Sequence, residues 1–186
     1  MTNAIKIMLV HLILLMSAQV FVSSMARDSS PLENEPNAPA EPNYMELSEQ
    51  QWRQRLTPLQ YHVLREKGTE RPFTGKYNRH FADGRYRCAG CGQTLFASEA
   101  KFQTRCGWPA FSQPADPNSV AESLDTSHGM IRTEITCTRC GSHLGHVFND
   151  GPAPTGLRYC INSAAMDFED KDSAEDDASG SPQRCR

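Results

Sequence analysis

Two short stretches, YRCAGCG at residues 86–92 and ITCTRCG at residues 135–141, decide the fold of this chain. Each holds a C-x-x-C turn, which directs two thiolates towards one centre, and the glycine after the second cysteine relieves backbone crowding. Two such turns complete a closed tetrahedral site of four sulfur ligands, which suits zinc. Its predicted ligands are Cys88, Cys91, Cys137 and Cys140. Because no coordination position is left open, we expect the metal to be structural and to supplement an apolar-poor core.

The same four cysteines allow two other interpretations, a pair of disulfides or a thioredoxin-like redox centre. A redox C-x-x-C pair usually opens a helix within a βαβ unit, and neither context is visible in this sequence. The spacer between the two turns is longer than that of a compact zinc ribbon. The insert therefore has a further purpose, and it contains a lone cysteine, Cys106.

Outward from the cysteine turns, the sequence predicts a mainly β domain with a minor helical part. Ser48 and Thr57 each precede a glutamine by three residues, and Pro58 suits a first helical turn, so we expect two short N-terminal helices. After Gly75, helical periodicity gives way to short segments broken by Gly, Pro, Asn and Asp. We interpret three of these segments as strands, at residues 84–87, 131–136 and 157–161.

The two ends of the chain differ from this domain in composition. Of the first 26 residues 18 are apolar, which predicts a secretory signal peptide over 1–26 and a secreted or periplasmic protein without stable membrane insertion after cleavage. The alternative is an uncleaved membrane anchor, but a bilayer span needs about 20 apolar residues and this run is shorter and interrupted. We interpret residues 27–46 as a Pro-rich linker, 47–168 as one domain and 169–186 as an acidic, disordered tail.

Length and charge exclude several classes of protein. Without the leader and the linker, roughly 120 to 130 residues remain, too few for a multidomain enzyme or a large α/β barrel. The formal net charge of −3 comes from the acidic tail and the rest is nearly neutral, so we expect no nucleic-acid partner. Cys185 lies in this tail, either as a stray exposed thiol or as a docking or second redox cysteine.

The segment LRYCINS, residues 157–163, contains a second lone cysteine, Cys160. In a strand, the two-residue period of side chains places Arg158, Cys160 and Asn162 on one face. The guanidinium would favour the thiolate, which is the nucleophilic form, and the amide could orient a reacting group. An isolated cysteine in an apolar strand is also commonly an inert small hydrophobe, so this segment alone leaves catalysis and packing both open.

Two histidines, His143 and His146, follow the second cysteine turn, so whatever fixes that turn also fixes both imidazoles. Either ring could reach Cys160 and stabilise its thiolate or deliver a proton to a leaving oxygen. The alternatives are surface histidines or partners of the metal site. We expect structural or exposed positions for the isolated histidines His62, His80 and His128.

The insert between the cysteine turns contains the loop CGWPAF, residues 106–111. Its glycine and proline shape a tight loop, which suits an exposed, movable Cys106. Trp108 either offers an apolar wall for a small alkyl or thioether group or packs in the core, and the residues leave both readings open.

Five motifs, in this order and spacing, resemble the methionine-R-sulfoxide reductases of the MsrB type. They are ERPFTGKY (70–77), YRCAGCGQTLF (86–96), CGWPAF (106–111), TCTRCGSHLGHVF (136–148) and GLRYCINSAAM (156–166). The resemblance extends from about Leu47 to Met166, nearly the whole domain. It implies an MsrB/Mss4-like β fold of small, coiled, mostly antiparallel sheets, with short N-terminal helices and a pair of structural zinc knuckles.

The resemblance also implies a role for each candidate. Cys160 matches the family's nucleophile and Cys106 its recycling cysteine. Trp108 matches the wall that holds the substrate's ε-methyl group, and Arg158 matches the activating cation. The residues that match the family's polar pocket are His143, His146 and Asn162. The thiolate would attack the sulfoxide sulfur while the oxygen is protonated through His146, with help from His143, and a sulfenic acid would remain. Cys106 would then form a disulfide with Cys160, which an external dithiol, thioredoxin in the family, would reduce.

The implied substrates are oxidised proteins or peptides that carry methionine-R-sulfoxide, with the free sulfoxide as an alternative. A secretory leader would separate the enzyme from cytosolic thioredoxin, so we expect a periplasmic or membrane-relayed thioredoxin-like donor. Two rival functions are a zinc-ribbon binding module and a general thiol-disulfide oxidoreductase that uses a C-x-x-C pair. The nearly neutral domain and the two thiols outside the metal site disfavour the binding module.

Overall fold

The computed structural model describes residues 41–171. The predicted signal peptide, most of the predicted linker and Cys185 lie outside this range. Two short helices come first, α2 (Glu49–Arg55) and α3 (Pro58–Leu64). The strands that follow are β1 (Gly84–Cys88), β2 (Thr94–Ala97), β3 (Lys101–Phe102), β4 (Ala110–Phe111), β5 (Val120–Asp125), β6 (Arg132–Cys137), β7 (His143–Phe148), β8 (Arg158–Ile161) and β9 (Met166–Asp170). None of the helices in the described part of the chain has the length and apolar character needed to cross a bilayer.

Both predicted helices are present, and their capping side chains explain where they begin. The Ser48 hydroxyl accepts a hydrogen bond from the Gln51 amide, and the Gln51 side chain accepts one from the Ser48 amide in return. Thr57 and Gln60 repeat this capping box at the start of α3. The helices contribute a few large side chains to the core, among them Trp52, Val63 and Leu64, which are fully or almost fully buried.

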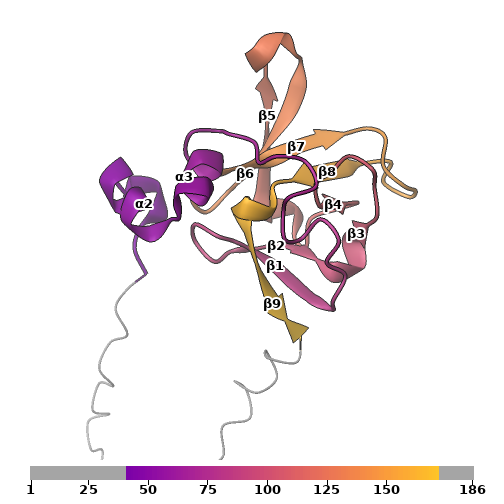
Figure 1. The fold of residues 1–186 in the computed structure, drawn as a ribbon, viewed down its shortest axis with the longest axis horizontal. Helices are drawn as coiled ribbons and strands as arrows, with labels where there is room; N and C mark the ends of the chain where they lie inside the picture. The colour runs from indigo at the N-terminus through magenta and orange to yellow at the C-terminus, as the bar shows by residue number, and fades with distance from the viewer. Residues whose placement is uncertain (1–40, 172–186) are drawn as a thin grey trace, which may run out of the picture. The chain divides into compact units, whose positions relative to one another are not determined.

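The strands form two antiparallel sheets, as Figure 1 shows. The smaller sheet has the order β2-β1-β9 and the larger one the order β3-β4-β8-β7-β6-β5. The strands predicted at residues 84–87, 131–136 and 157–161 correspond to β1, β6 and β8. The prediction of a mainly antiparallel β fold with two short helices is therefore confirmed. β8 and β7 lie at the centre of the larger sheet, which gives their side chains the most rigid positions that this fold offers.

Aromatic side chains from both sheets fill the core between them. Phe96 of β2 stacks on Phe111 of β4 with ring centroids 4.5 Å apart. Tyr86 of β1 meets the same Phe111 ring edge-on at 5.0 Å. Each aromatic pair adds about 0.5 to 1.5 kcal/mol beyond the area that it buries, so this cluster compensates for the scarcity of aliphatic residues.

The ordered elements extend slightly beyond the predicted domain bounds of 47–168 at both ends. A short 3-10 helix at Tyr44–Glu46 precedes residue 47, and the Tyr44 ring lies 6.4 Å from the Trp52 ring. At the other end, β9 continues to Asp170, opposite Gly84 of β1. Arg87 of β1 forms an ion pair with Glu169 at 2.9 Å. The first residues of the acidic tail are thus strand residues, because their backbone pairs with β1.

Candidate functional site

The two C-x-x-C turns bring four cysteines into one buried cluster. Their Sγ atoms all lie within 4.8 Å of one another. Two of the separations that join the turns are 3.7 Å between Cys88 and Cys140 and 3.6 Å between Cys91 and Cys137. Tetrahedral zinc thiolates with bonds of about 2.3 Å would place sulfur atoms about 3.8 Å apart. The cluster could therefore hold a metal ion.

Glycine conformation explains how each turn closes. Gly92 and Gly141 have φ angles of +75° and +67°, in the left-handed region that favours glycine. Their amides donate to the carbonyl oxygens of Cys88 and Cys137, each at 2.8 Å, and so close the turn around the sulfur atoms. The two turns are equivalent in geometry as well as in sequence.

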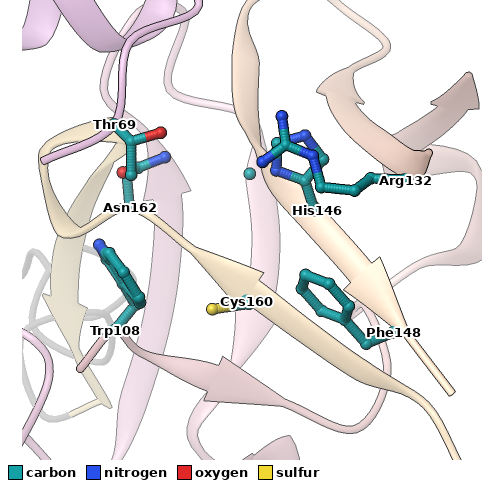
Figure 2. Close-up of a pocket in the computed structure, with 8 residues that line it drawn as sticks. Thr69, Trp108, Arg132, His146, Phe148, Cys160 and Asn162 are labelled. Carbon is teal, nitrogen blue, oxygen red and sulfur yellow. The ribbon is translucent and has the colours of Figure 1, made fainter. Parts of the chain in front are cut away.

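A small pocket on the central strands of the larger sheet contains the second candidate site (Figure 2). Cys160 of β8 lies opposite His146 of β7 in the strand register. The pocket has a volume of about 110 Å³ and is lined by Thr69, Trp108, Arg132, Gly145, His146, Phe148, Cys160 and Asn162. Figure 2 shows the Cys160 sulfur between the Trp108 and Phe148 rings. The pocket has room for the end of one side chain rather than for a drug-sized ligand.

The structure also brings the other lone cysteine of the domain, Cys106, next to this pocket. The Sγ atom of Cys106 lies 3.7 Å from that of Cys160, and both side chains are half-buried. A disulfide bond is about 2.05 Å long, so a small movement of the loop that carries Cys106 would join the two sulfur atoms. Thr104 orients this thiol through a contact of 2.8 Å between its hydroxyl oxygen and the Cys106 sulfur.

The two thiols differ in acidity. Burial raises the pKa of Cys160 to about 12, and the neighbouring Cys106 adds to this rise. Arg158 lowers the Cys160 pKa, as expected from the sequence, but by less than burial raises it, so the expected net depression is reversed in the resting structure. For Cys106, burial raises the pKa, but hydrogen bonds, that with Thr104 the largest, leave it lowered overall.

Peptide-level alkylation of the resting protein should reveal this difference. Near neutral pH we expect Cys106 to react faster than Cys160, because the reactive thiolate is more populated where the pKa is lower. Labelling of Cys160 should still increase at mildly alkaline pH, since its pKa of about 12 lies above that range. Quantitative mass spectrometry after brief iodoacetamide treatment measures both rates. A Cys160 rate that levels off near neutral pH would contradict this ordering.

A β-bulge brings the two histidines of β7 together. Ile135 of β6 pairs with Gly145, but Thr136 pairs with His143, so Leu144 is an extra residue on β7. In a regular strand, residues three apart point to opposite faces, and the bulge removes this difference. The His143 and His146 ring centroids consequently lie 5.4 Å apart.

Each of these histidines is held by its own carboxylate, which the sequence analysis missed. Nδ1 of His143 lies 2.8 Å from Glu134, and Nε2 of His146 lies 2.7 Å from Asp125. Arg132 forms an ion pair with Asp125 at 2.6 Å. The sequence contained one signal for Glu134. Arg132 and Glu134 share a face of the strand predicted at residues 131–136, and this strand leads into the cysteine turn that both histidines follow.

The two histidines occupy different positions relative to Cys160. His146 lines the Cys160 pocket, whereas His143 lines an adjoining hollow that shares Thr69, Arg132 and His146 with it. Burial lowers the pKa of His143, and Glu134 offsets this only in part. His143 is therefore a neutral, buried ring behind the pocket, and His146 is the imidazole closest to a ligand.

Arg158 acts on Cys160 from beside the pocket. Its guanidinium donates two hydrogen bonds to Asp150, at 2.8 and 2.9 Å, and lies over the Phe148 ring at 4.4 Å. Phe148 in turn lines the pocket. The cation is thus fixed in place and influences the thiol through its charge. Asp150, its partner, was not identified from the sequence.

The other histidines of residues 41–171 lie outside the lining of the Cys160 pocket. His62 lies on the surface beside Glu66, at 3.0 Å. His80 contacts the Tyr86 hydroxyl at 3.1 Å, next to the aromatic core. His128 lies in the turn between β5 and β6, with a φ of +54°, and lines the adjoining hollow.

Comparison with known proteins shows which family this chain resembles. A model of the SelR domain matches residues 56–170. A peptide methionine sulfoxide reductase MsrB of Bradyrhizobium diazoefficiens is 63% identical over 124 residues, which cover 67% of this chain and 89% of that protein. The protein of the same name from Cellvibrio japonicus is 63% identical over 115 residues (62% and 82%), and that from Thiobacillus denitrificans 61% identical over 122 residues (66% and 92%). Among solved structures, a Mis18 'Yippee-like' domain aligns with 47% of this chain and 95% of its own, at 20% identity and a TM-score of 0.38.

Proposed function

The chain belongs to the SelR-domain family of MsrB peptide methionine sulfoxide reductases, and from this premise we propose that Cys160 is the nucleophile of its reaction. The protein is an oxidoreductase that reduces methionine-R-sulfoxide, and methionine sulfoxide in peptides is its substrate. The observation that supports the assignment is the distance of 3.7 Å between the Cys160 and Cys106 sulfur atoms, in a pocket lined by Trp108 and His146.

In the first step, the Cys160 sulfur attacks the sulfur of the bound sulfoxide. A transient bond forms between the two sulfur atoms; the oxygen then moves from the methionine sulfur to the Cys160 sulfur as this bond and the original S–O bond break, so the products are methionine and a Cys160 sulfenic acid. The methionine sulfur is reduced by two electrons and the cysteine sulfur is oxidised by two. Because burial keeps the resting thiol protonated, the thiol proton must reach the oxygen during attack, and His146 is placed to transfer it.

The walls of the pocket position the substrate for this step. The Trp108 ring presents an apolar surface to the ε-methyl group, and its Nε1 donates to the Glu70 carbonyl oxygen at 3.1 Å, which fixes the ring. Both ends of the Asn162 amide are bound, to the Leu144 carbonyl at 2.9 Å and to the Glu70 amide at 3.0 Å. Asn162 therefore acts by holding the shape of the pocket, and Arg158 lowers the cost of forming the thiolate.

In the second step, the Cys106 thiol displaces the oxygen of the sulfenic acid. A disulfide between Cys106 and Cys160 forms and one molecule of water leaves, which balances the reaction. An external dithiol of the thioredoxin type then exchanges with this disulfide and restores both thiols. The lowered pKa of Cys106 supports this order, because the thiol that attacks a sulfenic acid must itself ionise.

Thiol counting tests this sequence of steps. We expect the reduced protein to lose two reactive thiols after one equivalent of methionine-R-sulfoxide peptide, and peptide mapping to find Cys106 joined to Cys160. The S epimer should leave both thiols intact. Loss of a cysteine from the buried cluster in place of Cys106 would show that the recycling assignment is wrong.

The four-cysteine cluster fits a structural zinc ion in donor type, separation and burial. Cys88, Cys91, Cys137 and Cys140 would hold it. When bound, the ion supplies a cross-link between the turn after β1 and the turn after β6, and the filled tetrahedral shell leaves it no part in the reaction.

Residues 1–26 support a proposal for location, although they lie outside the described structure. We propose that they direct export and that the protein works in the periplasm or outside the cell, with an uncleaved membrane-anchored form as the alternative. The physiological reductant is then a thioredoxin-like dithiol of that compartment. Reduction of the isolated disulfide form by candidate donors tests this proposal, and turnover with cytosolic thioredoxin alone would count against export.

A further inference from the structure

Glu70 is a buried carboxylate beside the substrate pocket that the proposed chemistry leaves without a role. Only 5% of the residue is exposed. Its two carboxylate oxygens accept hydrogen bonds from the backbone amides of Ser163 and Ala164, at 2.7 and 2.9 Å. These amides directly follow Asn162, at the end of β8. Glu70 thus holds the chain at the point where it leaves the pocket.

The main chain of Glu70 makes two further contacts with the pocket. Its amide donates to Oδ1 of Asn162 at 3.0 Å, and its carbonyl oxygen accepts from Nε1 of Trp108 at 3.1 Å. One residue therefore binds two pocket residues from different segments, the loop before β4 and the end of β8. Asn162 and Trp108 lie near each other in Figure 2, on the same side of the Cys160 sulfur.

The segment 70–77 is folded so that Glu70 has little freedom to move. A Cβ atom on Gly75 would lie 2.4 Å from the Glu70 carboxylate and 2.2 Å from the Ser163 hydroxyl, so only glycine fits at this close approach. The Tyr77 amide also donates to the Ser163 hydroxyl, at 3.2 Å. Both ends of the segment are thus bound to the same short stretch of chain after β8.

We propose that Glu70 is the positioning residue of the substrate pocket. Its carboxylate fixes the segment after β8, and through this anchor its main chain fixes the Trp108 indole and the Asn162 amide against the methyl sulfoxide group. Hydrogen bonds to an ionised carboxylate are stronger than neutral ones, and a binding site must hold its groups within a fraction of an ångström. The inference rests on the proposed pocket roles of Trp108 and Asn162.

Glu70→Gln tests the inference with a side chain of nearly the same size. The variant replaces one acceptor oxygen by an NH₂ group that faces a backbone N–H, so the anchor is lost while the volume is kept. We expect KM for a methionine-R-sulfoxide peptide to rise about 10-fold to 100-fold, because small displacements of positioning groups have effects of this size. The kcat should change far less, since substrate binding and the transition state lose the same contact.

The fluorescence emission of Trp108 distinguishes a change at the indole from a general loss of stability, because a folded but less stable protein should keep the same emission wavelength. In a Trp52→Phe background, Trp108 is the only tryptophan left, because the chain has two. We expect Glu70→Gln to shift its emission to longer wavelength as the indole loses its fixed partner. Ser119→Ala is the matched control: it removes one hydrogen bond, from the Ser119 hydroxyl to the Asp116 carbonyl oxygen at 2.7 Å, at a buried serine outside the segments that Glu70 holds. It should lower Tm without changing KM or the emission.

The outcomes separate a positioning role from a structural one. If Glu70→Gln lowers Tm as Ser119→Ala does, but keeps the KM and emission of the parent, the inference is overturned. If that variant does not fold, Gly75→Ala presses a methyl group against the same carboxylate and should raise KM and shift the emission; unchanged values overturn the inference equally. Trp108→Ala checks the premise that Trp108 forms a wall of the substrate pocket. If its KM is unchanged, both the proposed wall and the inference are refuted. If its KM rises while Glu70→Gln keeps the KM of the parent, only the inference is refuted.

Discussion

Replacing Cys160 with serine is expected to abolish the reduction of methionine-R-sulfoxide while the protein stays folded. A serine hydroxyl is not nucleophilic at neutral pH, and loss of a catalytic nucleophile reduces kcat by at least about 10⁴-fold. The change removes only polarisability and a little volume from a half-buried position of β8, so Tm should remain close to that of the parent. The measurement is the conversion of an R-sulfoxide peptide with excess dithiothreitol, beside a thermal melt.

Cys106→Ser is the matched control, because the Cys106 sulfur lies 3.7 Å from that of Cys160 but its proposed role is in recycling alone. With a protein dithiol as the only reductant, we expect one methionine per chain and then arrest at the sulfenic acid, which dimedone traps on Cys160. Full turnover by Cys160→Ser would show that the nucleophile is misassigned. Full turnover by Cys106→Ser with that dithiol would remove Cys106 from the cycle and leave Cys160 in place.

Replacing Cys88 with serine is expected to remove the metal and unfold the protein, whereas the Cys160 variant should stay folded. The residue is buried and contributes one of the four clustered sulfur atoms that join the turn after β1 to the turn after β6. Binding energy of a structural metal is folding energy, so we expect the free energy of unfolding to fall by more than about 5 kcal/mol, as much as the total stability of many domains. Elemental analysis for zinc and circular dichroism during a thermal melt measure the two losses.

The comparison with Cys106→Ser makes this result specific to the cluster. Both variants remove one thiol, but Cys106 lies outside the cluster, so its variant should keep the metal and the melting temperature of the parent. A Cys88→Ser protein that melts like the parent would refute the structural role of the metal. Removal of the metal from the parent by a strong chelator should reproduce the instability of Cys88→Ser, because both remove the same cross-link.

The sequence predicted those parts of the fold that depend on local interactions. The capping boxes at Ser48 and Thr57 identified both helices, since each signal is contained within four residues. The paired cysteine turns identified the cluster for a similar reason. Strands β3 and β4 are two residues long, too short for any periodic pattern, and they are defined only by pairing with partners elsewhere in the chain.

The sequence predicted which residues form the pocket, but it did not predict the carboxylates that bind the histidines or the direction of the Cys160 pKa shift. Three separate motifs supply the residues that the structure brings together, which are Cys106, Trp108, His146, Cys160 and Asn162. The carboxylates Asp125 and Glu134 were missed because their partners are set by the assembled sheet: Glu134 reaches His143 across the register shift between β6 and β7, and Asp125 reaches His146 from β5, two strands away. The direction of the Cys160 pKa was also missed, because burial by the assembled sheet outweighs the one adjacent cation that the sequence reveals.

The small volume of the substrate pocket restricts which damaged residues this enzyme repairs. A space of about 110 Å³ receives the tip of one oxidised side chain, and the backbone that carries it must remain outside. A methionine sulfoxide still enclosed in the interior of a folded protein cannot be presented in this way. Repair of such a residue therefore waits for local opening of the client, and its rate follows the population of that open form.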